Sequence, residues 1–142
     1  MGDVVNVWIV DDDPDSVEVI KEALEAKSDR QMTAYCEVIP DIVELFRRLG
    51  NRKRPDALVV DVLWPAPEDG LLDPAPGLGL AWTLKEALGD SVPVLGLSVA
   101  GRTYSKAAEH VGIGPLLSKG LASGDAIASR ILSLVREARE RS

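Results

Sequence analysis

Strand-length apolar runs alternate with helix-period segments along this chain of 142 residues. The run from Val4 to Val10 is apolar on both faces apart from Asn6, which is typical of a parallel strand covered on each side. In the next segment, Val17, Ile20 and Leu24 recur at helical spacing. Further strands are predicted within 30–38, 55–65, 92–98 and 113–119, and further helices at about 41–50, 78–88, 104–111 and 124–140. The pattern therefore predicts five βα units.

Five strands joined by helical crossovers predict an α/β fold, a parallel sheet with helices on both faces in a three-layer α/β/α sandwich. Parallel neighbours need long connections, and such crossovers are right-handed. We expect a single domain over residues 1–142, because a chain of this length buries roughly two-thirds of the surface that it exposes when unfolded. Gly50 is expected to close the second helix. Ligands in such folds bind beyond the carboxyl ends of the strands.

Composition narrows the class of protein. The chain carries 23 Asp and Glu against 16 Lys and Arg, a net charge of −7, and no basic cluster of the kind that binds nucleic acid. It has one cysteine, Cys36, to which we assign no chemistry, and neither a secretory signal nor an apolar run of the ~20 residues that a membrane span requires. The basic stretch REARERS is expected to be a solvated helix end. We expect a cytoplasmic protein with no direct nucleic-acid contact and no membrane insertion.

Polar residues stand where four of the predicted strands end. These residues are Asp11, Asp12, Asp13, Asp61, Ser98 and Lys119. Asp13 is expected to cap the first helix, with Pro14 at the first helical position. Because the strands are parallel, the other five residues are predicted to meet at one edge of the sheet, although they are far apart in the sequence.

Such a set of charges favours one kind of chemistry. Two carboxylates ~4 Å apart in an effective dielectric near 20 repel by roughly 4 kcal/mol, so a positive charge must share the site. A few hard oxygen ligands with room for water and phosphate suit Mg²⁺, and Lys119 supplies a second positive charge. One aspartate is then able to attack a phosphorus atom and form an acyl phosphate. We interpret the set as a magnesium-dependent phosphoryl-acceptor site.

The stretches VWIVDDDPDSVEVIKEALE and LVVDVLWP resemble the CheY-like receiver domains of two-component response regulators, and the resemblance extends over nearly the whole chain. It implies that Asp61 is the phosphoacceptor. It also implies that Ser98 and Lys119 contact the phosphoryl group. The implied Mg²⁺ ligands are Asp11, Asp12, Asp61 and the backbone carbonyl of Leu63.

The resemblance also implies a topology and partners. The strand order would be 2-1-3-4-5, as in flavodoxin-like folds. The phosphodonor would be a histidine kinase or a histidine phosphotransfer protein, and the only chemistry would be the chain's own phosphorylation and dephosphorylation. No output domain is expected after the last helix, so the signal would leave through a downstream protein target, a further phosphorelay step or a change in a homodimer.

The sequence departs from the usual receiver pattern at four places. Gly120 follows Lys119 where a proline is usual, Leu116 replaces an aromatic residue, and Val99 replaces a small residue. The segment 65–79 is longer and richer in proline than the usual turn. It is either a lid or partner surface beside Asp61, or a tolerated surface loop.

Two other classes of protein fit part of the pattern. In a haloacid-dehalogenase-like phosphatase, Asp11 would be the nucleophile and Asp13 the acid, but Asp61 would have no role. A phosphorylation-independent binding module with a receiver-like fold would account for Leu116, Gly120 and the long loop, but not for the complete acidic set.

Overall fold

The computed structural model describes residues 3–11, 14–28, 32–61, 76–98, 105–113, 116–118 and 124–141. Strands and helices alternate along them, as the sequence predicts. The elements are β1 (Asp3–Val10), α1 (Pro14–Ala26), β2 (Met32–Ile39), α2 (Ile42–Gly50), β3 (Ala57–Asp61), α3 (Pro76–Leu88), β4 (Val94–Ser98), α4 (Ser105–Val111), β5 (Leu117–Ser118) and α5 (Gly124–Arg141).

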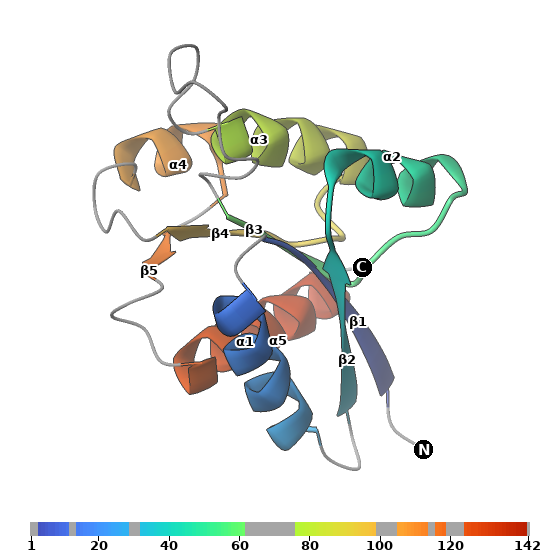
Figure 1. Ribbon diagram of the computed structural model, residues 1–142, viewed down its shortest axis with the longest axis vertical. Coiled ribbons are helices and arrows are strands. Elements are labelled where there is room, and N and C mark those ends of the chain that lie inside the picture. The colour runs from blue at the N-terminus through green and yellow to red at the C-terminus, as the bar shows by residue number, and fades with distance from the viewer. Residues whose placement is uncertain are drawn as a thin grey trace.

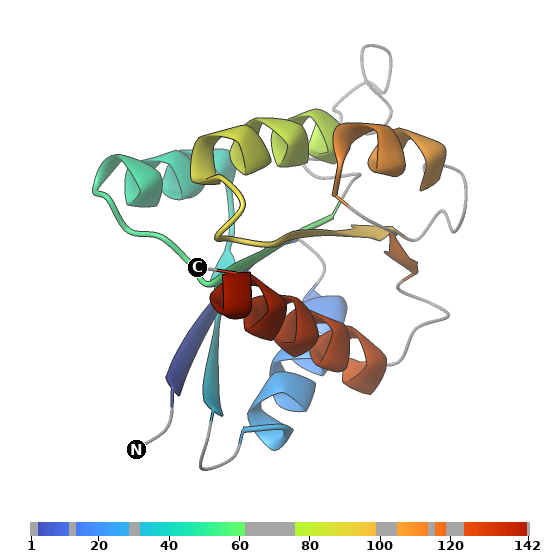
Figure 2. The same ribbon diagram turned by 180° about the vertical axis from the view of Figure 1, so that it is seen from behind.

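Within the described residues, five parallel strands form one sheet in the order β2-β1-β3-β4-β5. Helices α2, α3 and α4 cover one face, and α1 and α5 cover the other (Figures 1 and 2). The three-layer α/β/α sandwich and the strand order 2-1-3-4-5 are therefore confirmed. Each face of the sheet has its own core, centred on residues such as Ile20 and Ile131 on the α1–α5 side and Leu45 and Leu84 on the other.

The central strands are buried because helices cover both of their faces. From Val7 to Val10 every residue of β1 is buried, and so is every residue of β3. Consecutive side chains of a strand point to opposite faces, so Val7 and Ile9 enter one core, whereas Trp8 and Val10 enter the other. An apolar run without alternation is what a strand between two helix layers requires.

Helix α2 is attached to the sheet by one fully buried residue and a group of polar contacts. Leu45 is the buried side chain of α2, whereas Val43 and Phe46 are 74% and 49% exposed. Asp41 caps the helix by accepting a hydrogen bond of 2.8 Å from the backbone N–H of Glu44.

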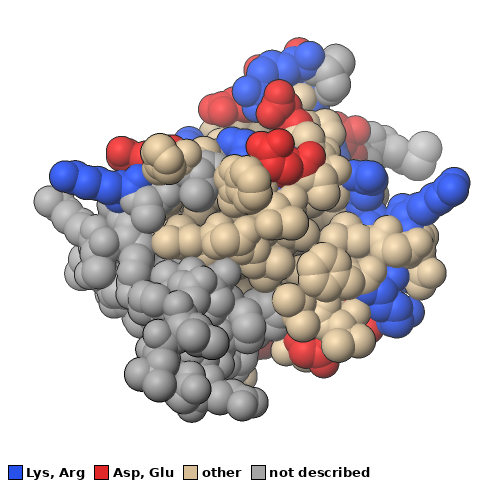
Figure 3. Space-filling view, turned by 90° about the horizontal axis from the view of Figure 1, so that it is seen from above, with Lys and Arg blue, Asp and Glu red and all other residues tan. Residues whose placement is uncertain are grey.

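Viewed from above, uncharged side chains occupy the middle of the layer formed by α2, α3 and α4 (Figure 3).

Arg48 joins α2 to two strands. It pairs with Glu44 at 2.8 Å and with Glu37 of β2, and its guanidinium lies 5.5 Å from the ring centroid of Trp8 in β1. Two hydrogen bonds lower the pKa of Glu44 to about 2. The bond from Arg47 contributes most, and the bond from Arg48 contributes next. Glu44 therefore stays ionised at neutral pH, and α2 keeps these contacts.

The ends of several elements differ from the sequence prediction. Strand β5 contains Leu117–Ser118, much shorter than the predicted 113–119, because β5 pairs with β4 only at the last two residues of β4. Helix α3 begins at Pro76, so residues 76–79 belong to a helix and not to the predicted loop. Proline is favoured in the first helical turn, where its missing N–H is not needed.

One prediction about a helix end is wrong, and a second holds only in part, because Arg136, Glu137, Glu140 and Arg141 are exposed at the end of α5 but Arg139 is engaged. Gly50 does not close α2 but is its last helical residue; Asn51 caps the helix, and Arg52 has the positive φ of 62°. Arg139, in the stretch predicted to be solvated, donates a hydrogen bond of 2.8 Å to the backbone carbonyl of Val4 and pairs with Asp56 at 3.4 Å. The end of α5 is thereby tied to β1 and to the residue before β3.

We expect Leu45→Ala to lower the free energy of unfolding by about 2–5 kcal/mol, because it removes the buried side chain that holds α2 and leaves a cavity. Val43→Ala on the exposed side of the same helix is the matched control, and its effect should stay within about 0.5 kcal/mol. Urea unfolding followed by circular dichroism measures both values. Equal losses for the two variants would show that Leu45 does not anchor the helix.

Candidate functional site

Asp11 and Asp61 lie side by side at the carboxyl ends of the two central strands. Val10, the last residue of β1, pairs with Val60 of β3, so the next residues along the two strands are Asp11 and Asp61. Neighbouring strands are about 4.8 Å apart. The fold therefore brings together two acidic residues that are separated by 50 positions in the sequence.

Both carboxylates are buried. Asp11 is 2% exposed and Asp61 is 7% exposed, and the Oδ2 atom of Asp11 is inaccessible to solvent. Among the residues whose burial the structure describes, these two are the only polar or charged ones that are buried. Burial of like charges on adjacent strands is costly, so their position calls for a positively charged group or a ligand.

Ser98 belongs to the same end of the sheet. Asp61 pairs with Leu97 of β4, and Ser98, the last residue of β4, is the next residue along that strand. Ser98 in turn pairs with Ser118, the last residue of β5 and the one before Lys119 in the sequence. The backbone thus places the ends of four strands at one edge, as predicted.

The other predicted site residues, Asp12, Leu63 and Lys119, lie outside the described residues, and so do Asp13, Val99, Gly120 and most of the predicted loop, residues 65–75. Their roles remain predictions. Leu116, where receivers usually carry an aromatic residue, is half-buried against the core on the α2–α4 side. The Leu116 side chain is therefore held by packing against described residues of this core.

The donor set fits a hard divalent cation. Asp11 and Asp61 supply carboxylate oxygens, which are the ligands that Mg²⁺ prefers when it keeps several of its waters. Within the described ranges there is no group of three His, Cys, Asp or Glu side chains that would hold a metal alone. The two described carboxylates are therefore chemically compatible with the predicted Mg²⁺ ion.

A pocket of about 440 Å³ opens beside Asp11, between the first turns of α1 and the end of β2. Its other walls include Pro14 and Glu18 of α1, Val38 of β2 and Pro40. Val38 and Pro40 are not among the predicted site residues. Val38 ends the second predicted strand and Pro40 follows two residues later, so both lie at the edge of the sheet where the site is predicted.

Cys36 of β2 is half-buried, and burial raises the pKa of its thiol to about 12. The thiol therefore stays protonated at neutral pH and is a poor nucleophile. This agrees with the assignment of no chemistry to Cys36.

The chain is similar to solved structures of receiver domains. A response regulator receiver domain protein from Clostridium thermocellum aligns with 97% of this chain and 99% of its own at a TM-score of 0.73 and 14% identity. A response regulator from Thermotoga maritima aligns with 94% and 98% of the two chains at a TM-score of 0.72 and 19% identity. The BeF₃-activated DrrB receiver domain aligns with 94% and 98% at a TM-score of 0.71 and 14% identity.

These likenesses show that the chain has the fold of response regulator receiver domains, which confirms the predicted resemblance at the level of the fold. No protein-family model matches the sequence, and no curated protein matches it. Among the described residues, no helix has the length and apolar character that crossing a bilayer requires.

Removing one of the two buried charges should stabilise the fold when divalent cations are absent. We expect Asp61→Asn to raise the free energy of unfolding in the presence of a chelator by about 1 kcal/mol or more, because carboxylates ~5 Å apart in an effective dielectric near 20 repel by roughly 3 kcal/mol. Urea unfolding is the measurement, with Asp11→Asn as a second test.

Asp125→Asn is the matched control, because the side chain of Asp125 is 77% exposed on α5 and pairs only with Lys27 among the described residues. Its stability should differ little from that of the wild type. If the Asn variants at positions 11 and 61 are both less stable than the wild type, repulsion between the buried carboxylates is not the dominant interaction there.

Proposed function

We propose that this chain is a response regulator receiver that accepts a phosphoryl group on Asp61 from a histidine kinase or a histidine phosphotransfer protein. The observation that carries the proposal is the burial of Asp11 and Asp61 at adjacent strand ends of a receiver-type sheet. A site of this kind holds two like charges in place before any ligand arrives. It is therefore suited to a cation, and the bound cation would allow the site to accept an anionic phosphoryl group.

Asp61 is the nucleophile in this proposal. One of its carboxylate oxygens forms a bond to phosphorus while the bond from phosphorus to the donor's imidazole nitrogen breaks, so that the phosphoryl group moves and the imidazole leaves. Ser98 and Lys119 would contact the equatorial phosphoryl oxygens and stabilise their charge. Asp11, Asp12, Asp61 and the carbonyl of Leu63 would hold Mg²⁺, which supplies positive charge between the carboxylates and the phosphate.

Asp61, and not Asp11, is the better candidate for the nucleophile. Asp61 is the last residue of β3, which lies between β1 and β4, so it has Asp11 on one side and the end of β4 on the other. A phosphoryl group on Asp61 would therefore lie next to both the metal ligands and Ser98. The haloacid-dehalogenase-like reading leaves this central position without a role.

The output of the proposed switch would pass through protein contacts. Leu116 lacks the aromatic ring that usually changes position on activation, and it packs against the core on the α2–α4 side. We propose that phosphorylation instead alters the segment around β4, α4 and β5, next to Ser98, and that a downstream protein target reads this change in the cytoplasm.

Incubation with Mg²⁺ and a small phosphodonor such as acetyl phosphate should add one phosphoryl group, detected by intact-protein mass spectrometry. The adduct should be absent from Asp61→Asn and absent when a chelator replaces Mg²⁺. Asp125→Asn should be labelled like the wild type, because the side chain of Asp125 is exposed on α5 and pairs with Lys27. An unchanged adduct in Asp61→Asn would contradict the proposal, and repeated turnover of p-nitrophenyl phosphate that Asp11→Asn abolishes would favour a phosphatase.

The acyl phosphate should decay slowly once formed. Leu63 and Ala100, each two residues beyond a predicted site residue, carry no polar group that would orient an attacking water. We expect Leu63→Asn to shorten the half-life of the label severalfold, while Val43→Ala on the exposed side of α2 leaves it unchanged. Mass spectra taken over time after removal of the phosphodonor measure the decay. Equally rapid loss from wild type and Leu63→Asn would exclude this role for the apolar residues.

A further inference from the structure

Helix α2 carries an apolar stripe on its exposed side. Ile42, Val43 and Phe46 are 39%, 74% and 49% exposed. Val43, Phe46 and Gly50 lie three and four residues apart, so they follow one another along the same side of the helix. Among the described residues, nothing lies within 4 Å of the position that a Cβ atom on Gly50 would take. The stripe is therefore accessible to a partner.

Basic residues follow the carboxyl end of α2. Arg52, Lys53 and Arg54 are exposed, and in the part of the chain that the structure describes their side chains have no acidic partner. The backbone N–H groups of Arg52 and Lys53 donate hydrogen bonds of 3.0 Å to the carbonyls of Leu49 and Arg48. These bonds hold the segment against the last turn of the helix, so three positive charges are kept at this end of the stripe.

The amino end of α2 is acidic. Asp41 caps the helix, is exposed and has no basic partner among the described residues. Glu44 in the first turn and Glu37 of β2 pair with Arg47 and Arg48. These five residues together carry a net charge of −1, against +3 on the three basic residues that follow the helix. The apolar stripe therefore lies between an acidic end and a basic end.

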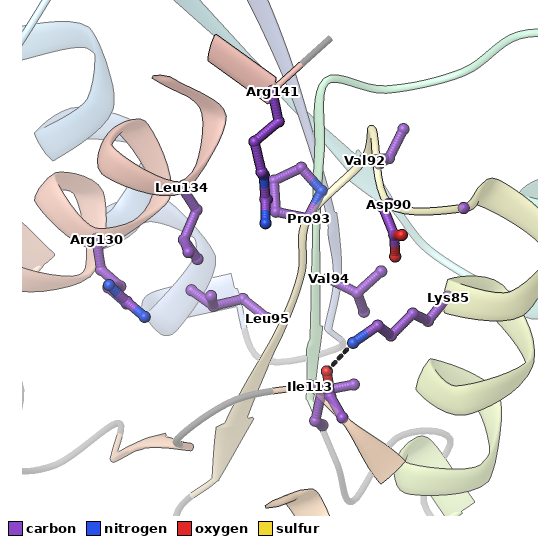
Figure 4. A pocket seen from close by; sticks show the side chains of 12 residues that line it. Lys85, Asp90, Val92, Pro93, Val94, Leu95, Ile113, Arg130, Leu134 and Arg141 are labelled. Atoms are coloured by element: carbon purple, nitrogen blue, oxygen red, sulfur yellow. Dashed lines mark hydrogen bonds between the residues drawn. The ribbon is translucent and has the colours of Figure 1, made fainter. Parts of the chain in front are cut away.

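The neighbouring helix α3 adds no charge on the side of α2. It lies between α2 and α4 (Figure 1), and its Lys85 donates a hydrogen bond to the backbone carbonyl of Gly112, which follows α4 (Figure 4). Leu80, Thr83 and Ala87 lie about 140–160° around the helix from Lys85, and all three are uncharged. The charges that border the stripe are therefore those of α2 and of the segments next to it.

An exposed acidic stripe lies on the other face of the sheet. Asp15, Glu18, Glu22 and Glu25 are exposed on α1 at spacings of three and four residues, and α1 covers the face opposite to α2 (Figures 1 and 2). Two copies of the chain that meet through α2 would keep these acidic stripes apart. Charges are screened over about 8 Å at physiological ionic strength, so a net charge of −7 on each copy does not prevent this contact.

We propose that two copies of this chain associate through α2, with the two helices antiparallel about a two-fold axis. Such a contact uses the same surface on both copies, so the surface must be complementary to itself. An antiparallel arrangement brings the acidic end of each α2 to the basic end of the other, whereas a parallel arrangement would place like charges together. This complementarity of charge favours a second copy of the chain as the occupant of the surface.

Phe46 lies near the middle of this arrangement. Val43 is three residues before Phe46 and Gly50 is four residues after it, so Val43 of each copy comes opposite the open space at Gly50 of the other. Asp41 is five residues before Phe46 and Arg52 is six residues after it, so these opposite charges also come together. One two-fold axis thus accounts for the apolar, glycine and charged positions.

The contact is small. At 1.5 Å per residue the nine residues of α2 span about 13.5 Å, whereas standard interfaces bury about 800 Å² on each partner. We expect a weak dimer in exchange with the monomer, populated at high protein concentration. The inference does not depend on phosphorylation of Asp61.

Self-association of the full chain tests the proposal. In sedimentation velocity runs between ~10 µM and ~1 mM, the weight-average mass should rise towards that of two chains. Over the same range, the backbone amide signals of residues 41–54 in the ¹⁵N-labelled chain should shift, and those of α1 and α5 should not. Asp61→Asn should associate as the wild type does, which separates this test from that of the phosphoryl site.

Two variants of the surface should each weaken association by about tenfold or more, because every change occurs twice in a two-fold dimer. Phe46→Ser removes the aromatic ring at the centre of the stripe. Lys53→Glu combined with Arg54→Glu places negative charges opposite the acidic end of the other copy. Circular dichroism confirms that each variant is folded.

Two control variants change the other face of the sheet, and their association should stay within about twofold of the wild type. Val19→Ser matches Phe46→Ser, because Val19 is 51% exposed on α1. Arg136→Glu combined with Arg141→Glu changes two exposed residues of α5 and lowers the net charge by the same four units as the double variant at the end of α2.

The proposal is overturned if the chain stays monomeric at the highest concentration, if a control variant weakens association as much as its counterpart, or if the concentration-dependent shifts gather on α4 and α5. Shifts of residues 41–54 that appear only with vesicles of anionic lipid would assign the surface to a membrane and would also overturn it.

Discussion

Repulsion between buried carboxylates is the constraint on which this account depends. Asp11 and Asp61 are 2% and 7% exposed and follow one another across two central strands. Pairing of β1 with β3 fixes the backbone positions from which the two side chains start, so the two residues cannot move apart without disturbing the sheet. A cation that binds between the two carboxylates relieves this repulsion, so the repulsion favours cation binding.

The rest of the fold supports that position. Apolar residues on both faces of β1 and β3 bury these strands between two helix layers, and burial lowers the local dielectric around the carboxylates. Contacts away from the site hold the layers in place. Arg48 joins α2 to β1 and β2, and Arg139 joins the end of α5 to β1.

Much of the architecture was predictable from the sequence, because both-face apolar runs and helical spacing mark buried parallel strands and their crossovers. The ends of elements were less predictable. Strand β5 is short because pairing with β4 determines its length, and residue pattern does not reveal where pairing stops. Pro76 lies in the segment predicted to be a loop, which is rich in proline and glycine, yet it begins α3, because proline is also favoured at a helix start. The location of Asp11 and Asp61 followed from the rule that parallel strands end at one edge. The self-complementary surface of α2 was not foreseen, since helical spacing in α2 identifies the buried side and does not show what the other sides face.

Binding of a paramagnetic divalent cation tests the central claim most directly. Mn²⁺ added to the ¹⁵N-labelled chain should broaden the amide signals of residues near Asp11 and Asp61 first, and Mg²⁺ in excess should restore them. Asp11→Asn should require a much higher Mn²⁺ concentration for the same broadening. If broadening begins elsewhere on the acidic surface, or is the same in Asp11→Asn, then the two buried carboxylates do not share a cation and the proposed phosphoryl site loses its physical basis.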